Sequence, residues 1–86
     1  MKMQVIATRD VVANVYGPPM YVIHLGQSIR GFGDECQRKE KGNVLGEHPE
    51  DFELIHLGEW DDETGKFEPL ENFKQIASGA NYRAVK

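Results

Sequence analysis

Alternating hydrophobic and polar positions dominate the first part of the chain. Residues 3–10, MQVIATRD, alternate and are rich in β-branched residues, and residues 11–16, VVANVY, repeat the pattern. This alternation predicts two short strands joined by a tight turn. Gly-Pro-Pro at residues 17–19 predicts a bend, because proline lacks the backbone N–H that a strand ladder needs. Residues 20–24, MYVIH, then predict a third short strand.

The pattern next changes to a helical period. Apolar side chains recur at intervals of four, three and four residues, at Leu25, Ile29, Phe32 and Cys36. This spacing traces one face of a helix that we expect from about Gly26 to Lys39, followed by a Gly-Asn stop at residues 42–43. Gly31 and Gly33 weaken such a helix by roughly 0.5–1 kcal/mol each relative to alanine. Either another group approaches the backbone closely there, or the first turns are irregular.

A β-hairpin and a short helix are predicted in the second half. Residues 52–60, FELIHLGEW, are apolar on both faces, as in an inner strand covered by a helix. DDETG at residues 61–65 supplies turn acceptors and a glycine free to adopt a positive φ, and KFEPL then predicts a returning strand that ends at Pro69. Residues 71–78, ENFKQIAS, predict a short helix stopped by Gly79, with one face made by Leu70, Phe73 and Ile76 or Ala77.

These elements predict an α+β fold, with an antiparallel sheet of about four to five short strands and one main helix packed on it. The chain of 86 residues suffices for one domain, and a domain of this size buries about 60–65% of its unfolded surface. We expect a single domain over residues 1–86, with residues 80–86 as a candidate flexible tail. Hydrophobic residues at 40% and charged residues at 28% argue against wholesale disorder.

Composition also bears on location and cofactors. No window approaches the ~20 apolar residues of a membrane-spanning helix, and the first residues lack the apolar stretch of a signal peptide. The single cysteine, Cys36, cannot form an internal disulfide, which fits a reducing compartment. We therefore expect a protein that stays in the cytosol where it is made, without membrane contact and without a cofactor.

The charge is unevenly distributed along the chain. The formal net charge is −4, but residues 1–43 carry six Lys or Arg against four acids, which gives +2, and residues 44–86 carry four against ten, which gives −6. Only the first half is suited to face phosphate, and its excess of positive charge is small. Because nucleic-acid affinity depends on neutralised phosphates, a strongly basic DNA condenser is excluded.

Metal and catalytic motifs are weak in this sequence. The histidines and the cysteine lack C-x-x-C or H-x-x-x-H spacing, which disfavours a zinc site. The acidic run at residues 61–63 lacks the pattern of a calcium loop, because Asn72 stands where that loop has its glutamate. Cys36 falls on the apolar stripe of the helix and is expected to be a core residue. We predict no catalytic residues and no metal ligands.

Several motifs together resemble a known viral family. They are VIATRD near the start, YGPPMYV at the bend, SIRGF in the helix, and HPEDFELIHLGEWDDETGKFE from residue 48. Over about residues 3–70 the chain resembles the small nonstructural protein of gokushovirus-type microviruses, which are single-stranded DNA phages. It departs from that pattern at Gly31 and Gly33, where small residues such as alanine or serine are commoner, and at Met20, where an aromatic residue is usual.

The resemblance implies a DNA-binding or DNA-packaging role. Such a protein would act in the cytoplasm of the infected bacterium, bind single-stranded viral DNA or the replication complex, and favour packaging of the genome. Implied partners are the viral DNA and phage replication or capsid proteins, and we expect a homo-oligomer because sheet edges need cover. The resemblance carries over no catalytic residue.

Single-strand binders combine cations with aromatic platforms, and the candidate DNA contacts are Arg9, Tyr16, Tyr21, Arg30, Arg38, Lys39, Lys41 and Arg83. Arg30 has an alternative role as an ion pair with Asp34 one helical turn away, and the tyrosines have one as strand-packing residues. The cations at residues 38–41 have the alternative role of a solvated helix end that complements the helix dipole. Trp60 and Phe67 lie beside the acidic run and are expected to pack across the hairpin. The rival hypothesis is a protein-interaction module that presents the acidic hairpin to a basic partner, without DNA contact.

Overall fold

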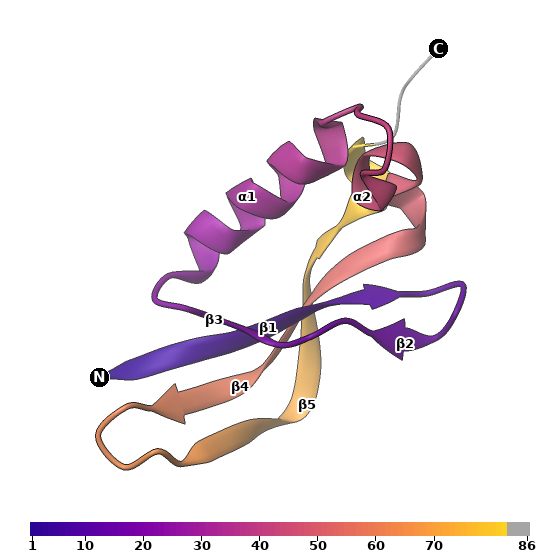
Figure 1. Cartoon of the computed structure of the whole chain (residues 1–86). Coiled ribbons are helices and arrows are strands. Elements are labelled where there is room, and N and C mark those ends of the chain that lie inside the picture. The colour runs from indigo at the N-terminus through magenta and orange to yellow at the C-terminus, as the bar shows by residue number, and fades with distance from the viewer. Residues whose placement is uncertain (83–86) are drawn as a thin grey trace.

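The computed structural model describes residues 1–82, which form a sheet with one long helix on it (Figure 1). The strands are β1 (Lys2–Asp10), β2 (Val15–Tyr16), β3 (Met20–Val22), β4 (Phe52–Asp61) and β5 (Phe67–Ser78). The helices are α1 (Leu25–Gln37), α2 (Val44–Glu47), and the single-turn 3-10 helices η1 (Pro49–Asp51) and η2 (Gly79–Tyr82). The predicted α+β class, with one main helix on an antiparallel sheet, is confirmed.

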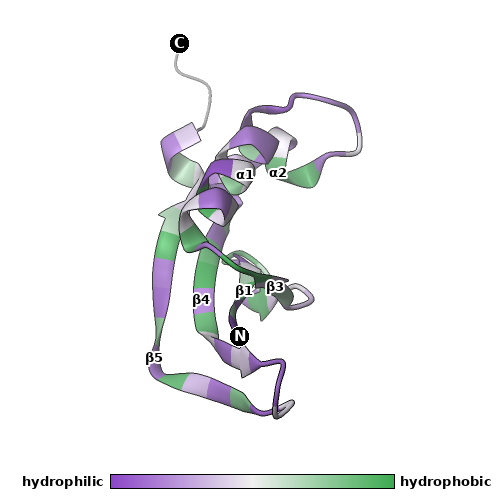
Figure 2. Cartoon of the chain, turned by 90° about the vertical axis from the view of Figure 1, so that its left-hand side faces the viewer, coloured by the Kyte–Doolittle hydropathy of each residue, from purple (hydrophilic) through white to green (hydrophobic). Residues whose placement is uncertain are grey.

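The sheet has five strands, and every pairing in it is antiparallel. Its order is β2-β1-β4-β5, and β3 pairs with β1 on the same side as β2. β1 and β4 are the central strands, and Figure 2 shows hydrophobic residues concentrated along β4 and hydrophilic ones in the loop after α1. The predicted inner strand over residues 52–60 is therefore confirmed.

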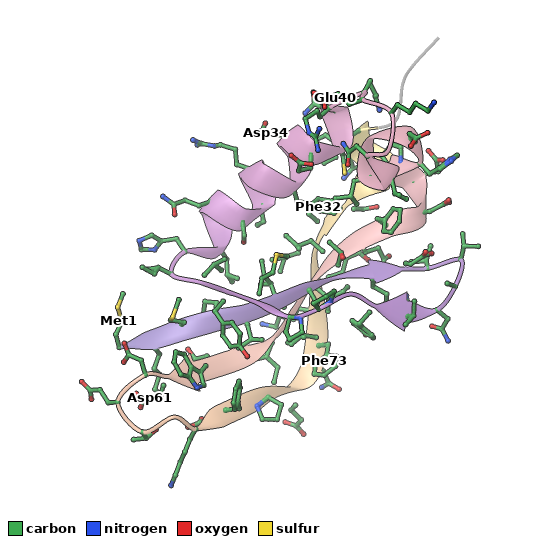
Figure 3. The ribbon with its side chains drawn as sticks, in the orientation of Figure 1. Met1, Phe32, Asp34, Glu40, Asp61 and Phe73 are labelled. Atoms are coloured by element: carbon green, nitrogen blue, oxygen red, sulfur yellow. The ribbon has the colours of Figure 1, made fainter. Side chains whose placement is uncertain are left out.

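The core lies between α1 and the sheet. Ile6 from β1, Leu54 from β4, and Phe32 and Cys36 from α1 form its buried centre, and Leu25 and Ile29 pack against it. Phe32 points from the helix toward the strands (Figure 3). The predicted apolar stripe of α1 is thus the face that covers the sheet, and Cys36 is a core residue, as predicted.

One of the two helix glycines has a packing role. A Cβ at Gly33 would lie 2.9 Å from the Cζ atom of Tyr82, so the ring of Tyr82 occupies the space beside the helix backbone. A Cβ at Gly31 would meet nothing within 4 Å. The helix is continuous through both, and close approach is the correct explanation at Gly33 only. At the end of the helix, the Asn43 side chain donates to the carbonyls of Glu35 and Arg38.

Two predictions about the second half are wrong. Residues 71–78 form a strand and not a helix, and β5 continues past Pro69 to Ser78. β4 is the reason: its outer backbone groups need hydrogen-bond partners, and residues 74–78 supply them. Proline is tolerated because β5 is an edge strand. The second predicted strand is also shorter than expected, since only Val15 and Tyr16 pair with β1.

The hairpin between β4 and β5 forms as predicted. The Asp61 carboxylate accepts a hydrogen bond from the Glu63 backbone N–H at 2.9 Å, and Gly65 has φ of 72°. At the other end, η2 brings the Tyr82 ring edge-on to Phe32, with centroids 6.5 Å apart. Residues 83–86 of the candidate tail lie outside the described residues.

Candidate nucleic-acid interface

The two tyrosines among the candidate DNA contacts lie on the sheet face turned away from α1. Tyr21 pairs with Val5, and Tyr16 pairs with Arg9. Directly paired residues share a face, and successive side chains of a strand alternate between faces. Because Ile6 faces α1, Val5 and Arg9 face the other way, and both tyrosines lie with them.

Three further aromatic residues join the tyrosines on that side. Tyr21 contacts Trp60 edge-on at 5.6 Å and Phe67 at 6.1 Å between ring centroids, and Tyr16 contacts Phe73 edge-on at 6.2 Å. We call this surface the aromatic face, and it consists of Tyr16, Tyr21, Trp60, Phe67 and Phe73. Trp60 and Phe67 are also direct cross-strand partners, so their predicted packing role is confirmed.

A bend in β5 brings these residues together from opposite edges of the sheet. Gly58 pairs with Pro69 and His56 pairs with Lys74, so one residue of β4 stands opposite four residues of β5. Such a bulge bends the strand, and Figure 1 shows β5 turning sharply near its label, below the place where it passes behind β1. Gly58 is required at this point, since a Cβ there would lie 2.8 Å from the Pro69 Cα atom and collide with the carbonyl of Glu68.

The aromatic face is exposed and hollowed. Phe67 is 60% exposed, Phe73 52%, Tyr16 44% and Tyr21 41%. A hollow of about 280 Å³ is lined by Tyr21, Trp60 and Phe67, and a second of about 220 Å³ lies between Phe67 and Phe73. Large apolar rings left accessible in this way are typical of a binding surface.

Arg9 is the candidate cation placed beside this face. Its guanidinium carbon lies 6.0 Å from the centroid of the Tyr16 ring. Its Nη1 forms an ion pair with the Glu53 carboxylate at 3.4 Å, and its Nη2 donates to the Asn14 side chain. Arg9 is therefore held in position next to an exposed ring, with part of its charge compensated by Glu53.

The other described cations of the candidate set belong to α1 and the loop after it. Arg38 binds both carboxylate oxygens of Glu35, and its Nη1 lies 2.6 Å from the Glu40 carboxylate. This contact with Arg38 lowers the pKa of Glu35, and the same contact raises the pKa of Arg38. Lys39 donates to the backbone carbonyls of Cys36 and Gly46. These side chains close the end of the helix.

Arg30 and Lys41 are exposed on α1 and in the loop that follows it. Within residues 1–82 the ion pairs include none between Arg30 and Asp34, so that pairing does not form. Arg83 lies outside the described residues. The described candidates therefore divide into Arg9 and the tyrosines on one side of the sheet and a helix group on the other.

The predicted acidic hairpin lies at one end of the sheet, next to the first residue (Figure 3). The Met1 amino group donates to the Asp62 carboxylate at 2.7 Å and lies 3.8 Å from the Glu63 carboxylate. The Glu63 side chain is 81% exposed. The hairpin thus presents negative charge to the solvent beside the aromatic face.

One cluster combines side chains that metal ions use. His48, Glu50 and Asp51 each offer a ligand atom, and these atoms lie within 4.8 Å of one another. All three belong to one short segment around η1, and His48 and Glu50 are exposed. The C-x-x-C and H-x-x-x-H spacings of zinc sites do not detect a cluster of one histidine and two carboxylates. Exposed acidic side chains gather in this way without an ion, and we assign no metal role to them.

Burial governs the chemistry of the single cysteine. Cys36 is fully buried under α1, and loss of solvation raises the pKa of its thiol. A thiol kept protonated in this way is a poor nucleophile. Among residues 1–82, no helix has both the length and the apolar character needed to cross a membrane.

Part of this interface can be predicted from the sequence. The pairing of Trp60 with Phe67 follows from the predicted hairpin, because residues at matched distances from a turn share a face. The local spacing predicts that Phe73 lies on one face of a short helix, and no local pattern indicates that it meets Tyr16. That contact depends on the bulge at Gly58.

Comparison with known proteins agrees with a viral origin. The family model described as Phage ORF5 protein matches residues 3–82, which is nearly the whole chain. No curated protein matches the chain significantly, and no solved structure does. The chain therefore belongs to the Phage ORF5 protein family.

Proposed function

We propose that this phage protein binds single-stranded DNA through the aromatic face. In this proposal it acts in the cytoplasm of the bacterial host, as a homo-oligomer, and favours packaging of the viral genome, as the resemblance to microvirus nonstructural proteins implies. The single observation that carries the proposal is the group of partly exposed rings from four strands. Unpaired bases stack on such rings, and each stacked base contributes about 1–3 kcal/mol.

The distribution of charge across the sheet supports this surface. Glu59 pairs directly with Gln4 and Glu68, so these side chains share the face of β1 to which Gln4 and Ile6 belong. The Glu59 carboxylate, which accepts a hydrogen bond from the Gln4 side chain at 3.2 Å, therefore lies on the opposite face from Trp60. Glu68 also borders the hollow between Phe67 and Phe73. Arg9 remains beside Tyr16 to contact a phosphate. Binding in this mode depends more on stacking than on charge, which suits a chain with a net charge of −4.

A second candidate function is that of a protein-interaction module. The exposed carboxylates of Asp62 and Glu63 favour it, because an acidic hairpin at the end of the sheet attracts a basic partner. Phage replication or capsid proteins and host factors are the partners that this alternative names. It requires no DNA contact and leaves the aromatic face without a role.

Fluorescence anisotropy of a labelled single-stranded oligonucleotide at low salt tests the first proposal. We expect Phe67→Ser and Phe73→Ser each to lower the affinity by about 5- to 150-fold, the equivalent of one stacked base. Val44→Ser is the matched control, since Val44 is 53% exposed on α2, away from the aromatic face. It should bind like the original protein.

Salt dependence separates stacking from phosphate contact. With Arg9 as the principal cation of the face, log affinity against log salt should have a slope near −0.7, the value for about one phosphate in a single strand. Charge reversal of Arg38 and Lys39 should leave the slope unchanged. No anisotropy change at low salt, or equal binding by all three serine variants, would refute the aromatic face as a DNA site. Loss of a co-purifying phage protein on neutralising Asp61, Asp62 and Glu63 would then support the alternative.

A further inference from the structure

A groove of about 530 Å³ opens between α1 and the strands beside it. Its floor is formed by Ile6, Phe32 and Leu54, which belong to the buried core. Met20 and Val22 of β3 line one side of the groove. The volume lies in the range of small-ligand pockets, roughly 300–1,000 Å³, and therefore leaves room for one bulky side chain. The groove is thus an apolar opening that reaches the centre of the domain.

Gly31 keeps this groove open. It lines the groove from α1, and a Cβ at this position would meet nothing within 4 Å. Glycine is disfavoured inside a helix, and no close contact at Gly31 explains its presence. Gly33 differs, because its missing side chain makes room for Tyr82. At Gly31 the missing side chain leaves empty space.

Carboxylates border the groove on the helix side. Asp34 and Glu35 both line it. Among residues 1–82, Asp34 takes part in none of the ion pairs, whereas Glu35 binds Arg38. An apolar floor with a carboxylate at its border complements a bulky apolar side chain carried next to a cation. It disfavours the phosphate groups of a nucleic acid.

We propose that this groove docks a segment of a partner protein that carries a bulky apolar side chain beside a lysine or arginine. The apolar side chain enters above Ile6 and Leu54, and the neighbouring cation pairs with Asp34. The site lies on the face of the sheet covered by α1, opposite to the aromatic face. The proposal therefore goes beyond DNA binding, and DNA and the partner segment occupy separate surfaces.

NMR titration of the isotope-labelled protein with short peptides tests the groove directly. The probe is the capped peptide Gly-Lys-Phe-Lys-Gly, compared with versions in which glutamates replace the lysines or alanine replaces the phenylalanine. We expect shifts centred on Met20, Val22 and Gly31 with the first peptide. Replacing the lysines should weaken binding about 5-fold, and replacing the phenylalanine about 10-fold or more.

A matched pair of helix substitutions completes the test. Gly31→Leu fills the groove. We expect it to lower the affinity for the Gly-Lys-Phe-Lys-Gly peptide at least about 10-fold. Gly26→Leu makes the same change where a Cβ also meets nothing within 4 Å, but outside the groove, and should bind normally. Met20→Ser provides an independent change on the β3 side should Gly31→Leu perturb folding. Undiminished binding in Gly31→Leu and Met20→Ser, or equal binding of the acidic peptide, would overturn the proposal whatever the DNA result.

Discussion

Alanine at Gly33 and alanine at Gly31 should change the stability of the protein in opposite directions. Both glycines lie inside α1, so each substitution gains up to about 1 kcal/mol of helix propensity. They differ in their surroundings. At Gly31 the added methyl group enters open space, whereas at Gly33 it lies 2.9 Å from the Cζ and Oη atoms of Tyr82 and 3.0 Å from its Cε1 atom.

The contact at Gly33 decides the sign of the effect. Carbon atoms prefer separations of about 3.5–4.0 Å, so the Tyr82 ring must move by roughly half an ångström or more. That ring packs edge-on against Phe32, with an interplanar angle of 77°. Overpacking of this kind costs typically 1–3 kcal/mol. After the gain in propensity, Gly33→Ala should destabilise by about 1 kcal/mol, while Gly31→Ala stabilises by a similar amount.

Thermal denaturation, followed by circular dichroism, measures both changes. For a domain of this size, 1 kcal/mol corresponds to a shift of about 4–8 °C in Tm. The decisive comparison is Gly33→Ala made in a protein that already carries Tyr82→Ala. Because the ring is then absent, Gly33→Ala should stabilise that protein as Gly31→Ala stabilises the original. The coupling energy between the two sites should be about 2 kcal/mol. Equal stabilisation by both single substitutions in the original protein would refute the role assigned to Tyr82.

Two further predictions concern the rest of the core. Gly79→Ala should destabilise by about 3 kcal/mol or more, as judged from its urea midpoint, because the added Cβ collides with the Pro49 carbonyl oxygen; a midpoint within error of the original would contradict this. The Cys36 thiol should resist a disulfide reagent at pH 8 and react readily in urea. Its folded pKa is raised by burial, so its contribution to stability is present below the unfolded pKa and is lost as pH rises above about 9. If the free energy of unfolding, compared with that of Cys36→Ala, does not fall above about pH 9, this assignment is contradicted.

Patterns within single elements were sufficient for much of the fold. The period of Leu25, Ile29, Phe32 and Cys36 located α1 and its buried face, because a helix repeats its environment every three to four residues. The acceptors and glycine at residues 61–65 located the hairpin, since turn geometry depends on the residues of the turn itself.

The failures occurred where a partner strand decided the outcome. Leu70, Phe73 and Ile76 have helical spacing, yet they belong to β5, because β4 offers unpaired backbone groups that only a neighbouring strand satisfies. Local propensity is weak compared with the hydrogen bonds and burial gained by completing a sheet. For the same reason β5 continues through Pro69, although proline disfavours a strand.

For this protein the sequence by itself determined the helix, the hairpin, the buried cysteine and the uneven charge. Tertiary structure alone decided which side chains meet. The contact of Tyr16 with Phe73, the packing of Tyr82 against Phe32 and the groove beside Gly31 each depend on how separate elements are brought together. A surface assembled from several strands depends on the pairing register between those strands, and the hydrophobic pattern within one strand does not determine that register.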